Sequence, residues 1–276
     1  MRKLLRIDIE RMIKSPGMWV SLFISLALVI AQFITVVLPE SKDVLRFYRG
    51  TAMTYPDSVY NIWFGADAQH PFRITYLTIF PLLSTLPYGI TYHKDRKKGY
   101  INQMYTRMGR GKYLVSRYIA TFVSGGLAVL IPMVIAFILA ADVLPLLKPV
   151  NNRLFIMSGS SLLGNIYYTK PLMYMAVYAF IYFIYGGVFA SIALAVGDIF
   201  DYSFFVLIMP FAVYYVLGYI SQYIYFRTTG SFDPRIILGI IQSRHITAGG
   251  IFIETVVIGL ISFLIYWHRG MKKDVI

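Results

Sequence analysis

The chain has 276 residues, of which 58% are hydrophobic and only 14% are charged, and its mean hydropathy is +0.63. Soluble domains usually carry about a quarter charged residues, so this composition excludes a soluble globular fold as well as disorder. The absence of cysteine excludes a disulfide-stapled scaffold and an iron–sulfur cluster. The net charge of +13 does not indicate nucleic-acid binding, because too little polar surface remains to build a basic face on a soluble fold.

Residues 1–16 predict an amphipathic helix that lies flat on the membrane surface, with lipid as its partner. Leu5, Ile9, Met12 and Ile13 share one face, and basic residues occupy much of the rest. Pro16 stops this helix before the first membrane span. Two interpretations are open: a basic tail that only sets the topology, or an in-plane elbow helix that passes motion to the first span.

Six apolar runs of roughly 18–25 residues predict transmembrane helices. The connecting loops are too short for a soluble domain, so we expect an all-α integral membrane protein with one domain over residues 1–276. The first run is about 22 residues long, beyond the ~7–15 of a signal peptide, and is expected to be retained. The six spans are predicted at residues 17–38, 72–92, 113–140, 171–196, 204–225 and 250–267.

Basic residues predict the orientation of these spans. An even number of spans puts both termini on one side, and if that side is cytoplasmic, it holds 16 of the 26 Lys and Arg residues. The density of positive charge is then roughly threefold higher inside than outside, as the positive-inside rule requires. We therefore expect the protein to lie in the plasma membrane, with both termini in the cytoplasm.

The cytoplasmic loop over residues 93–112 carries an apolar stripe among its basic residues. Ile101, Met104, Tyr105 and Met108 follow helical spacing, and glycines lie on both sides of the stripe. A helix this short is marginal in water by itself, so something must cover the stripe. Three covers are open: the protein's own membrane helices, the lipid surface, or a partner protein.

Polar residues near the outer ends of the spans are candidates for a translocation path. Residues 235–242 predict an interfacial or re-entrant helix that is too short to span. Glu254 lies about one turn into the sixth span, and a carboxylate inside a membrane is a functional candidate by default. The alternative is that Glu254 reaches water or pairs with Arg244 or His245, since interfacial acids cost far less than central ones.

Small residues at four-residue spacing in spans three and four, such as Gly186 and Ala190, predict close helix packing. A seam inside one subunit and a seam between subunits are both open. Catalytic motifs are missing, because the four histidines lie far apart and no H-E-x-x-H or G-x-S-x-G occurs. Asp198 and Asp201 are expected to cap helix ends. We therefore expect neither an enzyme nor a metal site.

The order of a basic in-plane helix, a span, a large outer loop and a second span resembles the permease subunits of type-2 ATP-binding-cassette exporters. So does the inner loop, in which Asp95-Arg-Lys-Lys-Gly99 precedes a short helix and a turn with Arg110. The family usually has Glu where Asp95 stands, a Pro in the turn that is missing here, and a Lys where Arg117 stands. The resemblance implies a coupling helix that docks on an ATPase subunit. Its residues here would be Asp95, Gly99, Ile101, Met104, Tyr105, Met108 and Arg110.

The resemblance also implies the function: a six-span exporter subunit in a bacterial plasma membrane, paired with an identical or homologous permease subunit. No phosphate-binding loop occurs, since Gly111-Lys112 is followed by Tyr113. The chain itself is thus expected to bind no cofactor, with ATP and Mg on separate cytoplasmic ATPase subunits. Glu254 and Arg244 would lie at the outer mouth, and the cargo would be an amphipathic peptide, lipid or drug. The alternatives are a membrane-anchored receptor or immunity protein and an integral membrane transferase.

Overall fold

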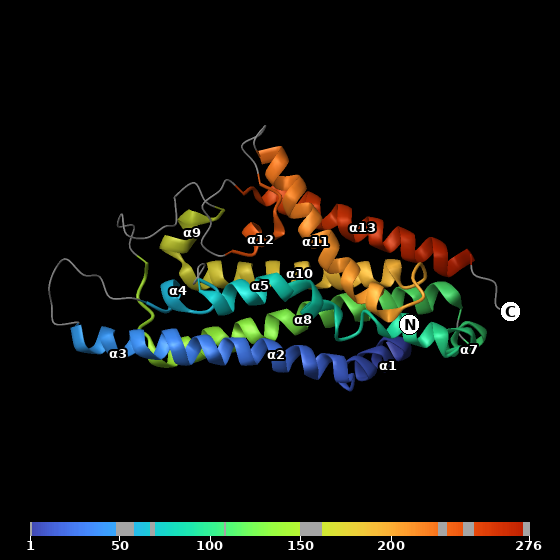
Figure 1. Cartoon of the computed structure of the whole chain (residues 1–276), viewed down its shortest axis with the longest axis horizontal. Coiled ribbons are helices and arrows are strands. Elements are labelled where there is room, and N and C mark those ends of the chain that lie inside the picture. Colours follow the sequence, from blue (N-terminus) through green and yellow to red (C-terminus); the bar gives the residue numbers. More distant parts are fainter. Residues whose placement is uncertain are drawn as a thin grey trace.

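The computed structural model describes residues 2–47, 58–66, 70–107, 109–149, 162–225, 231–239 and 246–272. These residues form helices and no strand, and the long helices run along an elongated bundle (Figure 1). The all-α prediction is thus confirmed. The elements are α1 (Arg2–Ile13), α2 (Pro16–Gln32), the π-helical η1 (Phe33–Val37), α3 (Leu38–Phe47), α4 (Val59–Ile62), α5 (Pro71–Thr85), α6 (Thr91–Lys97), α7 (Tyr100–Arg107), α8 (Arg110–Val143), α9 (Gly164–Thr169), α10 (Pro171–Val196), α11 (Ser203–Tyr225), α12 (Pro234–Ile237) and α13 (Ala248–Lys272).

Within the ranges that the structure describes, five helical segments are long and apolar enough to cross a membrane, which is the character of a multi-pass membrane protein. They are the continuous segment over residues 16–42, α8, α10, α11 and α13.

α5 occupies the second predicted span but has only 15 residues. It is about 22 Å long at 1.5 Å per residue, short of the roughly 30 Å hydrocarbon core. α5 packs against α2, α8, α10 and α11, and with the turn over residues 86–90 it leads back to the end where α1 lies (Figure 1).

The first span is longer than predicted. The sequence predicts its end at Leu38, but the helix continues past Pro39 to Phe47. η1 precedes the proline, and the Leu38 N–H donates five residues back to the Phe33 carbonyl. This π-helical turn shifts the hydrogen-bond pattern just before a residue that has no N–H, so the helix passes Pro39 instead of ending there.

The spans bury polar side chains and expose large apolar ones. α2 buries Ser21, Ser25 and Gln32, whereas Trp19 is 62% and Phe23 75% exposed. α13 repeats the pattern, because its buried residues include a glutamate, a threonine and a serine. In water such apolar surfaces would drive association. In lipid the apolar side chains lie in an apolar solvent, and some of the buried polar groups bond to neighbouring helices, Ser21 to α5 and Glu254 to α10.

α8 and α10 approach closely where both carry glycine. A Cβ on Gly125 would lie 2.4 Å from the Ala190 Cβ and 2.6 Å from the Gly186 carbonyl oxygen, so no side chain fits there. The neighbouring Gly126 and Gly187 pack against phenylalanine rings in the same way. The predicted small-residue seam therefore lies inside one chain, between spans three and four.

Two proline-associated hydrogen bonds fix the end of α5 against α2. Pro87 has no N–H to offer the Leu83 carbonyl, and the Ser21 hydroxyl of α2 donates to that oxygen at 2.6 Å. The Ser15 hydroxyl donates to the Pro87 carbonyl at 2.7 Å. These bonds hold the start of α2 and the turn after α5 together at one end of the bundle. We call this the basic end; it also holds α1, α6, α7, the start of α8 and the end of α13 (Figure 1).

Candidate functional site

At the basic end, Arg117 of α8 is held by carboxylates from two other helices. Its guanidinium is fully buried and donates to Asp8 of α1 at 3.0 Å and to Asp95 of α6. Both carboxylates are themselves buried. Buried ions are costly unless pairing and additional hydrogen bonds compensate for lost hydration, so the surroundings of these three groups decide whether the arrangement is stable.

Further donors complete the bonding of both carboxylates. Ser116 and Tyr88 donate from their hydroxyls to Asp8, at 2.7 Å and 2.9 Å. Arg11 donates to Asp95 at 2.9 Å. The group is electrically neutral, with two guanidinium and two carboxylate groups, and it joins α1, the turn after α5, α6 and α8. We call it the basic-end cluster; its members are Asp8, Arg11, Tyr88, Asp95, Ser116 and Arg117.

This cluster shows which side of α1 faces the bundle. The sequence places Leu5, Ile9, Met12 and Ile13 on a lipid-facing side, whereas the structure buries Leu4, Asp8 and Met12 against the protein and leaves Ile13 51% exposed. The helix is rotated because Asp8 reaches Arg117, and α1 packs on α8. A periodicity argument that counts only apolar residues misses Asp8. Its spacing of four residues from both Leu4 and Met12 is the signal that could have found it.

α6 is tied to the turn between α10 and α11. Arg96 donates to Asp198 at 3.0 Å and lies 3.5 Å from Asp201, and the Tyr92 hydroxyl also donates to Asp198 at 3.0 Å. Both acids therefore face Arg96, a partner that the expected role as helix caps did not include. The ring of His93 adds a hydrogen bond to a backbone carbonyl of the same turn at 3.0 Å.

The apolar stripe on α7 is covered by the protein itself. Ile101 and Tyr105 are buried and Met104 is half-buried. Burial also raises the pKa of the Tyr105 hydroxyl. Of the three covers left open by the sequence, the protein's own helices are the one found, while Met108 lies outside the described residues. The stripe packs on a cluster from α6, α8, α10 and α13 that contains Tyr92, Tyr113, Leu114, Leu194 and Tyr266.

The remaining predicted coupling residues, Gly99 and Arg110, lie just before and just after α7. Gly99 has a φ of +71°, a conformation that other residues adopt only with strain, and it forms the turn from α6 into α7. Arg110 donates to the Met271 carbonyl at 3.1 Å at the end of α13. The exposed side of α7 presents Gln103 and Thr106. A soluble partner would therefore meet this polar side, whereas Asp95, Ile101 and Tyr105 face inward.

Glu254 faces α10 inside the bundle. Its carboxylate is 8% exposed and accepts a hydrogen bond from the Tyr185 hydroxyl at 2.7 Å. Burial largely excludes water, one of the two surroundings expected from the sequence, and the other, a pair with Arg244 or His245, stays a prediction. Those two residues lie outside the part of the chain that the structure describes.

Arg73 of α5 is a further buried charge, and it lies at the start of the second predicted span. It is 1% exposed, donates to the Leu238 carbonyl at 2.8 Å, and forms no ion pair with any residue that the structure describes. The Tyr182 hydroxyl donates to the same carbonyl at 2.6 Å. This carbonyl follows α12, which replaces the predicted helix over residues 235–242 and covers only Pro234–Ile237.

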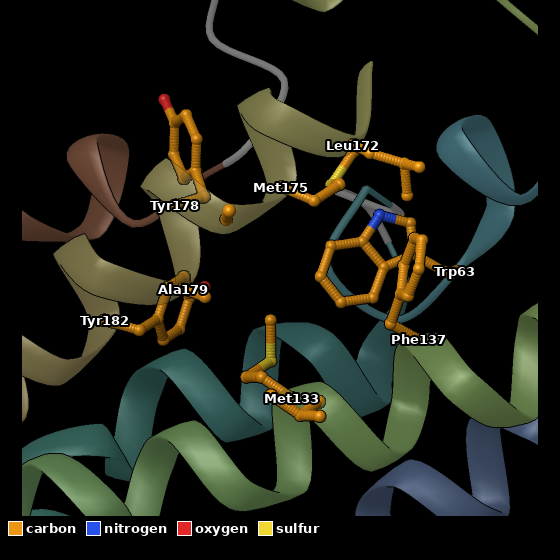
Figure 2. A pocket seen from close by; sticks show the side chains of 10 residues that line it. Trp63, Met133, Phe137, Leu172, Met175, Tyr178, Ala179 and Tyr182 are labelled. Atoms are coloured by element: carbon orange, nitrogen blue, oxygen red, sulfur yellow. The ribbon is translucent and has the colours of Figure 1, made fainter. Parts of the chain in front are cut away.

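An apolar pocket of about 220 Å³ lies between α8 and α10, toward the end opposite the basic end. Figure 2 shows Met133 and Phe137 of α8 facing Met175 and Tyr182 of α10, with the Trp63 ring closing one side. The pocket has almost no polar lining. It could hold an apolar group of moderate size but offers no groups for catalysis.

Comparisons of the chain with protein-family models, with curated proteins and with solved structures return no match. The site is therefore described by its own geometry. That geometry comprises a neutral ionic cluster and a covered amphipathic helix at the basic end, and buried Arg73 and Glu254 with an apolar pocket further along the bundle.

Proposed function

We propose that this chain is the membrane-spanning permease subunit of an ATP-driven exporter of the type-2 ATP-binding-cassette class, with ATP hydrolysed on a separate subunit. α5 with its following turn would then make the sixth passage between the two faces of the membrane. The observation that carries the proposal is the mechanical arrangement of the basic end. There the short helix α7 packs against the ends of the spans α8, α10 and α13.

The contacts of α7 support transmission of force. Its inner face packs on α8, α10 and α13, and Arg110, the first residue of α8, donates to the Met271 carbonyl in the last turn of α13. α6, directly before it, is bonded through Asp95 to Arg117 of α8 and through Arg96 to the turn before α11. A push on α7 would therefore reach four spans through packed side chains and ion pairs, which are the physical networks that carry coupling.

The covered stripe changes where a partner would dock. Because the protein's own helices cover the stripe, an ATPase subunit would contact the polar side of α7 with Gln103 and Thr106. Lys97 and Lys98, exposed at the end of α6, lie beside it along the chain. A basic, polar docking surface fits a partner surface with acidic residues.

The apolar pocket supports an amphipathic cargo. Its lining by Met133, Phe137, Met175 and Trp63 matches an acyl chain or an apolar side chain rather than a charged group. Arg73 and Glu254 are the charged groups buried in the spans away from the basic-end cluster, and one of them would be positioned to meet a polar part of the cargo. The pocket and these charges are compatible with a peptide, a lipid or a drug as the cargo.

The experiment is a charge reversal of the docking surface. The tagged chain carrying Gln103→Glu, Thr106→Glu and Lys97→Glu is solubilised in mild detergent, and the ATPase subunit that co-purifies is quantified. We expect at least a tenfold loss of the ATPase subunit, because three exposed positions turn acidic without disturbing the covered face. The matched control is Lys42→Glu in α3, an exposed lysine at the other end of the first span. Equal recovery of an ATPase subunit with both variants would contradict the docking surface.

A further inference from the structure

A second pocket, of about 510 Å³, opens at the basic end between α1, the start of α2 and the turn after α5. Ile7, Leu86 and Ile90 give it an apolar part. Charged side chains complete the lining: Glu10 and Arg11 of α1, Lys14 just after α1, and Lys94 of α6. Apolar and cationic groups side by side, at the point where the chain enters its first span, are what an anionic amphiphile needs.

Two of these four charged side chains have no ion-pair partner among the residues that the structure describes. Glu10 is paired with Arg6 at 3.0 Å, and Arg11 with Asp95 at 2.9 Å. Lys14 and Lys94 are exposed and form no ion pair within the ranges that the structure describes. Two ammonium groups therefore line the pocket without a counter-charge from these residues.

The backbone adds to this positive potential. Ser15, Pro16 and Gly17 line the pocket as the first turn of the long α2 helix, whose N-terminus carries a partial positive charge. A Cβ on Gly17 would lie 2.1 Å from the Leu86 carbonyl oxygen, so glycine allows this turn to reach the pocket wall. The Ser15 hydroxyl is committed to the Pro87 carbonyl and does not cap the helix.

The apolar part of the lining and the neighbouring Trp19 indicate a lipid rather than a soluble ion. Trp19, one turn further along α2, is 62% exposed, and tryptophan side chains favour the headgroup layer of a bilayer. Free phosphate would make no contact with the apolar part of the lining, whereas the first carbons of an acyl chain would pack against it. We propose that this pocket binds the phosphate headgroup of an anionic membrane lipid, held by Lys14, Lys94 and the first turn of α2. This proposal does not depend on the proposed transport function.

The test is native mass spectrometry of the purified full chain from mixed micelles of phosphatidylglycerol and phosphatidylcholine in equal amounts. The wild type is expected to retain one phosphatidylglycerol in preference to phosphatidylcholine. Lys14→Gln with Lys94→Gln should weaken that binding roughly thirtyfold, because each interfacial lysine contributes to attraction of anionic lipid. Both lysines are exposed and unpaired with described residues, so the double variant should fold. Lys14→Arg with Lys94→Arg should retain the lipid.

The matched control is Lys97→Gln with Lys98→Gln, which removes two exposed lysines of the same end that do not line the pocket. Equal phosphatidylglycerol binding by the pocket variant and this control would overturn the proposal. Displacement of the retained lipid by a few millimolar inorganic phosphate would overturn the lipid assignment, since the site would then belong to a soluble anion.

Discussion

At the scale of single residues, Arg117 carries the largest structural consequence. It is a fully buried cation whose two carboxylate partners are also buried, and Ser116, Tyr88 and Arg11 donate further hydrogen bonds to those carboxylates. Removing one member leaves a charge in a low-dielectric environment without compensation, which is the costly case for a buried ion pair. The cluster therefore acts as a neutral unit whose members are needed together.

Arg117→Met should lower the free energy of unfolding by on the order of 3–5 kcal/mol, because Asp8 and Asp95 lose their shared partner. The measurement is chemical or thermal unfolding of the purified chain in detergent. Arg6→Met is the control on the same end; Arg6 is paired only with Glu10 on the surface, and exposed pairs contribute little. Similar losses from both variants would show that the cluster does not carry this stability.

Only part of this cluster could be predicted from the sequence. Asp95 and Arg117 were singled out through the exporter resemblance, at positions where that family carries an acid and a base. Asp8 and Arg11 were treated as tail residues, because helical periodicity ranks apolar side chains and gives no information on which charge on one helix meets which charge on another. The partner of Glu254, Tyr185 of span four, was missed for the same reason.

At the scale of elements, α7 shows how an apolar pattern can be identified correctly while its cover stays open. Spacing located the helix and its inner face, since Ile101 and Tyr105 are buried. It could not tell whether those side chains meet another chain or the same one, because that depends on how α8 and α13 return to the basic end. The glycine seam between α8 and α10 likewise followed from spacing, but not its location inside one chain.

The cover of α7 can be measured by cysteine labelling, since the chain has no native cysteine. In the purified chain alone, we expect Gln103→Cys to react rapidly with a maleimide and Ile101→Cys to be at least tenfold slower, because only the second side chain lies under α8 and α13. Equal rates would mean that the stripe is uncovered without a partner.

Two glycines, one in the α8–α10 seam and one outside it, are expected to respond differently to an added methyl group. Gly125→Ala should destabilise the chain by a few kcal/mol, since its Cβ would lie 2.4 Å from the Ala190 Cβ and force the helices apart. Gly249→Ala in α13 has open space around its Cβ and should be neutral or stabilising by about 0.5–1 kcal/mol. Unfolding midpoints in detergent compare the two. A neutral Gly125→Ala would contradict the close approach.

At the scale of the whole molecule, hydropathy and charge predicted most of the architecture. α10 coincides with its predicted span, and α8, α11 and α13 differ from theirs only at the ends. The shortness of α5 was not foreseen, because a window of apolar residues does not register the turn that interrupts residues 86–90. The elongated α2–α3 segment was missed because Pro39 was taken as a helix end.

The orientation is testable with the same cysteine-free background. We expect Lys42→Cys to react with a membrane-impermeant maleimide on intact cells, and Lys272→Cys to react only after the cells are opened. The physical reason is the concentration of basic residues at the end that holds α1 and Lys272. The reverse pattern of labelling would invert the topology and place the docking surface outside the cell.

The central claim is that this membrane bundle works with a separate ATPase, and the mass of the native complex tests it most directly. The tagged chain is extracted from its native membrane in mild detergent and weighed intact by native mass spectrometry. The account predicts a complex that contains two permease chains, each of 31.6 kDa if both copies are identical, with two ATPase subunits. A chain that is recovered alone, or only with copies of itself, under conditions that preserve other membrane complexes would contradict it.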